Sequence, residues 1–151
     1  MRLPQRPASR HARQTIAILA GAVALAGAAA AQAPPKPVTT TLKTLSATSA
    51  GQPIVLPPGP VQATVSETTV PPHGQIAPHK HPYPRYVYVL AGRVRVINLV
   101  TGQTYELKAG DMSLDPVDQW HKAEALGDGP ARLIALDQTP PGVSNVVRQA
   151  P

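Results

Sequence analysis

The sequence predicts an all-β domain, a sandwich or a barrel, from three observations. Apolar and polar residues alternate with a period of two in short stretches after residue 60, as in strands that are buried on one face. Gly- and Pro-rich turns separate these stretches. No stretch after residue 31 has the apolar stripe of an amphipathic helix. The chain of 151 residues is long enough for one ordinary domain.

The first 31 residues have the pattern of an export signal. A basic stretch (1–14) precedes an apolar stretch (15–26) and a run of small residues (27–31). We expect cleavage after Ala31, which leaves no stable membrane anchor and places the protein in the periplasm or outside the cell. The alternative is an uncleaved anchor, although its apolar run is at the short limit for crossing a bilayer.

The net charge of +6 does not indicate a nucleic-acid-binding protein. Without the first 31 residues, 10 basic and 8 acidic residues remain, which leaves a charge of +2. These charges are scattered, and aromatic residues that would stack on bases make up only 3% of the chain. We therefore predict no nucleic-acid partner. The chain has no cysteine, so any metal must be held by His, carboxylate or amide groups.

The predicted barrel covers residues 61–138 and follows a Pro-, Thr- and Ser-rich extension, residues 32–60. This extension is expected to be a loose tether, in which residues 39–45 and 54–56 each add a short edge strand. A C-terminal tail, residues 139–151, ends the chain. Within the barrel the strands are expected, in order, at 61–66, 85–90, 93–96, 104–107, 112–114, 122–125 and 131–136. The core is expected to be aliphatic, because the chain has no Phe and one Trp.

Three histidines are candidate metal ligands. Side chains two residues apart in an extended segment point to the same side, which places the His79 and His81 imidazoles together. Ala77 and His81 each precede a proline, and this keeps the segment extended. His121 follows the turn at residues 115–116 and would bring a third imidazole from another strand. A His-x-His pair alone is more often solvated or hydrogen-bonded than bound to metal.

Two spaced motifs resemble those of the cupin family, G-x5-H-x-H-x3,4-E-x6-G and G-x5-P-x-G-x2-H-x3-N. Residues 74–92 read GQIAPHKHPYPRYVYVLAG, and residues 110–125 read GDMSLDPVDQWHKAEA. The resemblance implies a double-stranded β-helix (jelly-roll) barrel, often a dimer, with His79, His81 and His121 as metal ligands in the barrel mouth. The implied cofactor is a divalent transition metal, and imidazole ligands do not choose among Fe, Zn, Mn, Ni and Cu.

Arg85 is the main departure from the cupin motifs, because it occupies the slot of the metal-binding glutamate. Six residues separate it from Gly92, as the motif requires, so the alignment is not shifted. An arginine cannot ligate a metal and stays charged. At about 5 Å from a dication, with an effective dielectric of about 20, it would be repelled by roughly 6–7 kcal/mol. Three smaller departures remain. Gly74 is one residue closer to His79 than the first motif expects, and Asp118 and Ala125 replace the Gly and the Asn of the second motif.

Three arrangements would relieve this repulsion. In the first, the site holds no metal, and Arg85 and the histidines form a polar or anion-binding cluster. In the second, Arg85 turns aside onto a carboxylate such as Asp115, Asp118 or Glu124. In the third, three histidines hold the metal while the Arg85 fork clamps a carboxylate or phosphate of the ligand. Metal binding survives in the last two.

The expected ligand is therefore a small anionic molecule bound by Arg85. Gln119 shares the face of His121, and Tyr83 lies beside the histidine pair, so both are candidate ligand-binding residues. The leading hypothesis is a secreted, homodimeric cupin that acts as an oxygenase or isomerase, with no catalytic residue assigned. The alternatives are a non-catalytic binding or sensing module without bound metal, and a structural barrel.

Overall fold

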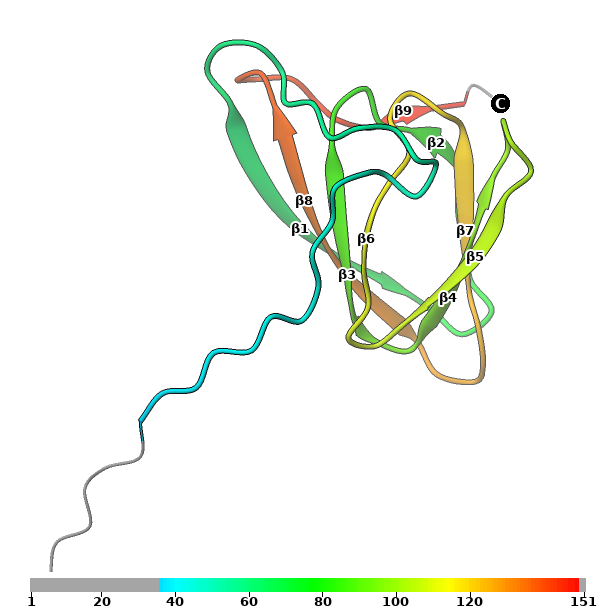
Figure 1. Cartoon of the computed structure of the whole chain (residues 1–151). Coiled ribbons are helices and arrows are strands. Elements are labelled where there is room, and N and C mark those ends of the chain that lie inside the picture. Colours follow the sequence, from blue (N-terminus) through cyan, green and yellow to red (C-terminus); the bar gives the residue numbers. More distant parts are fainter. Residues whose placement is uncertain (1–35, 150–151) are drawn as a thin grey trace, which may run out of the picture. The chain divides into compact units, whose positions relative to one another are not determined.

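The computed structural model describes residues 36–149, so the expected signal segment, residues 1–31, lies outside the described part (Figure 1). No helix in the described residues is long and apolar enough to span a bilayer. The strands of the described part, in chain order, are β1 (Gln62–Val70), β2 (Gln75–Lys80), β3 (Arg85–Ala91), β4 (Arg93–Asn98), β5 (Thr104–Lys108), β6 (Met112–Leu114), β7 (His121–Ala125), β8 (Ala131–Thr139) and β9 (Val147–Arg148).

The seven expected barrel strands are all present, and two more strands join them. β2 contains the expected extended His79 segment, and β9 lies in the expected C-terminal tail. The expected edge strands at 39–45 and 54–56 did not form. Residues 39–45 are almost entirely exposed and pair with no strand of the described part. Their backbone N–H and C=O groups therefore form no strand-to-strand hydrogen bonds there.

The strands form two antiparallel sheets that face one another around a common interior (Figure 1). One sheet has the order β1-β8-β3-β6 and the other has the order β5-β4-β7-β2-β9. The chain passes from one sheet to the other between β3 and β4 at Gly92. Gly92 has a φ of 74°, and a Cβ there would lie 2.6 Å from the Pro130 carbonyl oxygen. This corner explains the glycine that ends the first motif.

Along several strands, the inward-facing residues form a row that is apolar near one end of the strand and polar near the other. On β7, His121 shares the buried face of Ala123 and Ala125. On β8, Asp137 continues the buried alternation of Leu133 and Ala135. The apolar halves of these rows form the aliphatic core. The polar halves meet at the mouth of the barrel, and they place the candidate site there.

Candidate metal centre

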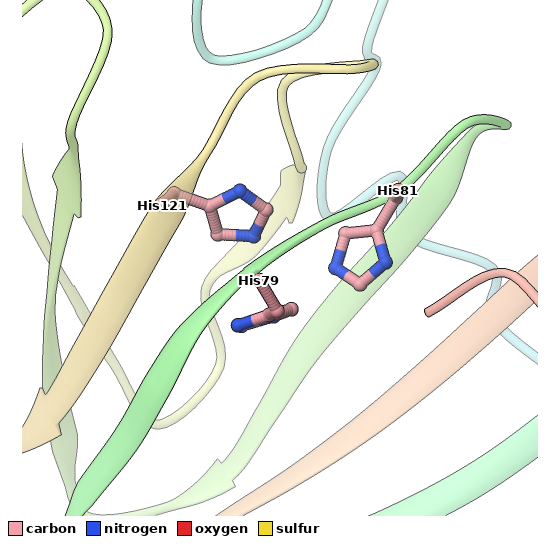
Figure 2. Close-up of side chains that lie close together, drawn as sticks. All are labelled: His79, His81 and His121. Carbon is pink, nitrogen blue, oxygen red and sulfur yellow. The ribbon is translucent and has the colours of Figure 1, made fainter. Parts of the chain in front are cut away.

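His79, His81 and His121 come together at the barrel mouth, as the sequence predicts (Figure 2). His79 and His121 are register partners on β2 and β7, and His81 lies just beyond β2. One ligand nitrogen from each ring lies within 4.8 Å of the others. This cluster could therefore hold a metal ion.

A backbone carbonyl orients each of the three rings. The Nδ1 atom of His79 contacts the Ala77 oxygen at 2.8 Å, and that of His121 contacts the Gln119 oxygen at 2.9 Å. The Nδ1 atom of His81 contacts the Asn145 oxygen at 2.6 Å. A carbonyl only accepts hydrogen bonds, so each Nδ1 carries the proton, and Nε2 keeps a lone pair for a metal. Such outer contacts fix ligand histidines in metal sites.

The buried ring nitrogens fit a metal. The Nε2 atoms of His81 and His121 are buried, and no described residue forms a hydrogen bond with either. Burial lowers the pKa of His79 to about 4, and it also lowers the pKa of His121. These two rings are therefore neutral near pH 7, which is the form that binds metal. Buried polar atoms without a partner are uncommon in proteins and indicate a missing ion or water.

Arg85 does not point a free charge at the histidines, because it is paired with Asp137. Arg85 Nε donates to Asp137 Oδ1 at 2.8 Å, and Nη2 donates to Oδ2 at 2.6 Å. The second expected arrangement therefore describes the geometry, although the partner is a different carboxylate from the three expected. Asn145 Nδ2 adds a third hydrogen bond to Asp137, at 2.6 Å. Burial alone would raise the pKa of Asp137, but the hydrogen bonds from Arg85 and Asn145 hold it below its usual value.

Asp115 is the other buried carboxylate at the mouth. Its Oδ2 atom lies 3.4 Å from His81 Nε2 and 3.8 Å from His121 Nε2. Burial disfavours its charged form, but its pKa lies below the usual value because a proton on the facing nitrogen of His81 or His121 and the Arg85 guanidinium both favour the carboxylate. Asp115 is therefore negatively charged at neutral pH.

A cavity of about 530 Å³ opens beside the cluster. This volume suits a small molecule. Aliphatic side chains such as Val87, Val96 and Leu133 form much of its wall. The charged and imidazole groups in its lining are His79, His121, Asp115, Arg85 and Arg148. His81 has no exposed surface, and its ring centre lies 4.8 Å from that of His79 and 5.0 Å from that of His121.

Tyr83 and Gln119 are not in the lining of this cavity. The backbone of Tyr83 is held by the Asn145 side chain, at 2.9 Å and 3.1 Å. Gln119 Oε1 accepts a hydrogen bond from Asn98 at 2.6 Å, and its carbonyl orients His121. Both residues therefore brace the site in this structure, and their binding roles stay predictions.

Sequence reasoning missed three contributors: Asp137, Asn145 and Arg148. The buried alternation along β8 was a signal for Asp137, because it places this aspartate on the inward face. Asn145 and Arg148 lie in the expected tail, where no periodic pattern pointed to them. Asp118 replaces the glycine of the second motif with a φ of 56°, a left-handed conformation that aspartate tolerates.

Comparisons with known proteins agree with this fold. Residues 66–137 match the family model described as Cupin domain. A polyketide synthase, CurC, from Streptomyces cyaneus is 36% identical over 64 residues, which cover 42% of this chain. The match covers only 40% of that curated relative.

Two solved structures are similar to part of this chain. An uncharacterized conserved protein with a double-stranded β-helix domain from Klebsiella pneumoniae subsp. pneumoniae MGH 78578 is 26% identical, with a TM-score of 0.48, and the match covers 56% of this chain and 72% of that one. Oxalate decarboxylase from Lactobacillus farciminis, in a formate complex, is 23% identical, with a TM-score of 0.48, over 58% of this chain and 26% of that one. The predicted all-β double-stranded β-helix is confirmed by the two-sheet fold and by the match of residues 66–137 to the family model described as Cupin domain.

Proposed function

We propose that this cupin domain binds a divalent transition metal through His79, His81 and His121 and uses it to act on a small anionic molecule, as an oxygenase or isomerase. The observation that carries the proposal is the state of the three rings. Each Nδ1 atom contacts a backbone carbonyl, which leaves Nε2 free, and two of the three Nε2 atoms are buried without a hydrogen-bond partner in the described part. The adjoining cavity supports a small-molecule ligand.

Two arginines in the cavity lining support an anionic ligand. Arg148, on β9, is exposed at the mouth and is the register partner of His79. Arg85 uses Nε and Nη2 for Asp137, and its Nη1 has no protein acceptor among the described residues. A bound divalent cation supplies Lewis-acid polarisation or oxygen activation. The arginines orient the anion, and the aliphatic wall excludes water around it.

Metal analysis of protein purified after expression of the full chain tests the metal site. We expect about one equivalent of metal in the wild type and loss of it in His81→Ala. His73→Asn is the matched control, since His73 is an exposed histidine with a φ of 57°, which asparagine tolerates. Less than about a tenth of an equivalent, unchanged by His81→Ala and by reloading, would sink the proposal.

Calorimetry of the metal-loaded protein with malonate, a small dicarboxylate, tests the anion site. Arg148→Gln should weaken malonate binding about tenfold, as expected for loss of a charged hydrogen bond. The control is Arg132→Gln, because Arg132 pairs with Glu67 and is not in the cavity lining. Oxygen uptake or substrate isomerisation with candidate carboxylates separates an enzyme from a non-catalytic binding or sensing module.

Export and dimer formation are part of the same proposal. The pattern of residues 1–31 supports export, and the resemblance to cupins supports a homodimer. Recovery of a protein that begins at Gln32 from the periplasm or the medium, with a dimer mass by light scattering, is the expected result. A cytoplasmic protein that retains Met1 would contradict export.

A further inference from the structure

A buried carboxylate faces two of the three histidines. Asp115 follows β6, and its backbone N–H donates to the Arg85 carbonyl oxygen at 2.9 Å, which fixes its position. Its side chain is 10% exposed. The Oδ2 atom lies 3.4 Å from Nε2 of His81 and 3.8 Å from Nε2 of His121. These are the same two nitrogens that are buried without a hydrogen-bond partner among the described residues.

The arrangement of these three atoms lacks a positive partner. Both Nδ1 atoms face backbone carbonyls and carry the ring protons, so a neutral ring presents a lone pair at Nε2. A carboxylate oxygen is also only an acceptor. Three acceptors that face one another in a mostly buried site, with no hydrogen-bond donor between them, destabilise a protein unless a cation or a donor lies among them.

The two separations fit a shared metal ion. With ligand bonds of about 2.1 Å, two donors on a tetrahedral metal lie about 3.4 Å apart, and two adjacent donors on an octahedral metal lie about 3.0 Å apart. The Asp115–His81 separation of 3.4 Å meets the tetrahedral value, and the Asp115–His121 separation of 3.8 Å exceeds it by a few tenths. Both values are close to those of two ligand atoms on one metal ion, so Asp115 can share a metal with His81 and His121.

Charge balance gives an independent reason. Arg85 takes the slot of the family's glutamate, but Asp137 neutralises it with two hydrogen bonds. Compared with the family's motif, the site then lacks one negative charge and one carboxylate ligand to the metal. Asp115 has both, and it approaches from the end of β6 rather than from β3.

We propose that Asp115 is the fourth protein ligand of the metal and replaces the glutamate of the first motif. The inference rests on the proposed metal binding by the three histidines. A metal held by three neutral imidazoles and one carboxylate carries a net charge of +1, the same as in the family's motif. The competing arrangement is a metal-free ion pair between Asp115 and a doubly protonated histidine.

Co²⁺ binding by the full chain, measured by competition with a chromophoric chelator, tests the inference. Asp115→Asn should raise the Kd for Co²⁺ about 100-fold and change the ligand-field absorption of bound Co²⁺. Asp118→Asn is the matched control, because Asp118 lies three residues away with a side chain that is 66% exposed, and it should change the Kd less than about twofold. His81→Ala should abolish binding.

The outcomes separate the two proposals. A wild type that binds no Co²⁺ overturns both the three-histidine site and the Asp115 ligand. Binding that is lost in His81→Ala but unchanged in Asp115→Asn, in affinity and in spectrum, overturns only the role of Asp115.

A measurement on the wild-type chain covers the case in which Asp115→Asn does not fold. Asp115 is the only one of the five aspartates that precedes a proline, so pairwise Asp and Pro labelling assigns its carboxyl carbon by NMR. Addition of Zn²⁺ should shift the Asp115 carboxyl resonance, and the exposed Asp128 resonance should stay in place. An unmoved Asp115 resonance at Zn²⁺ saturation overturns the inference.

Discussion

Two aspartates lie on either side of Arg85 in the β1-β8-β3-β6 sheet, and their surroundings differ in kind. Asp137, on β8, is the register partner of Arg85 and accepts three hydrogen bonds from Arg85 and Asn145. Asp115, after β6, faces two ring nitrogens that offer it no proton. The first carboxylate is satisfied within the protein and stabilises the fold. In the proposed metal site the second is satisfied by the bound cation, and this contrast separates a proposed functional group from a structural one.

Asp137→Asn tests the structural side of this comparison and should have the largest effect on folding. The Asp137 side chain is 8% exposed and that of Arg85 is 15% exposed, so the substitution leaves a nearly buried cation without its partner. We expect a loss of about 3 kcal/mol in the free energy of unfolding at pH 7, measured by urea denaturation. A loss below about 0.5 kcal/mol would mean that Arg85 finds another acceptor.

The same variant has an expected pH dependence. The pKa of Asp137 is lower in the folded protein than its ordinary value of 3.8, so the folded state stabilises the charged form. The stabilisation is fully present above pH 3.8 and is lost as the pH falls through the folded pKa. The difference in stability between wild type and Asp137→Asn should therefore be constant from pH 7 to about pH 5 and shrink below about pH 4. A difference that grows on acidification would contradict this sign.

Asn145→Ala tests whether the hydrogen-bonded pair of Arg85 and Asp137 supports the histidine cluster. Its expected effect on stability is intermediate. The Asn145 side chain bonds the Tyr83 backbone and Asp137, and its own carbonyl orients His81. We expect a loss of about 2 kcal/mol in stability and about a tenfold weaker Kd for Co²⁺. Ser144→Ala is the matched control, since the Ser144 side chain makes one long contact to its own segment. Lost stability with an unchanged Kd would show that the two regions are independent.

These residues show how far a sequence can be read. Alternation predicted the barrel strands, and extended geometry with motif spacing predicted the three histidines, because both depend on neighbours within one strand. The partner of Arg85 was not predictable in that way, because Arg85 and Asp137 are 52 residues apart and meet only through the register of β3 and β8. Asn145 acts from a segment without periodicity. Asp115 was visible as a carboxylate, but its approach to two Nε2 atoms depends on the fold.

Asp115→Asn sharpens the contrast between the two aspartates. In the metal-free protein, this substitution should stabilise the folded state. The asparagine Nδ2 supplies the donor that His81 Nε2 lacks, which is worth about 1 kcal/mol. Urea denaturation with a chelator present measures this gain, and added Co²⁺ should reverse the order of the two proteins. A loss of stability in the chelator would indicate that Asp115 is already paired with a ring proton.

Asp118→Asn should have the smallest effect on stability. It tests whether the contrast between Asp115 and Asp137 depends on their surroundings rather than on the removal of any negative charge near the histidines. Asp118 forms an ion pair with Lys80 at 2.6 Å, but its side chain is 66% exposed, so water screens the pair. Asparagine tolerates its φ of 56°, so the backbone, whose N–H donates to the His81 carbonyl at 2.8 Å, should keep its place. We expect a change within about 0.5 kcal/mol in urea denaturation, with or without Co²⁺. A larger change that depends on Co²⁺ would mean that the field of any nearby carboxylate matters, and the separate roles of Asp115 and Asp137 would no longer follow from their contacts alone.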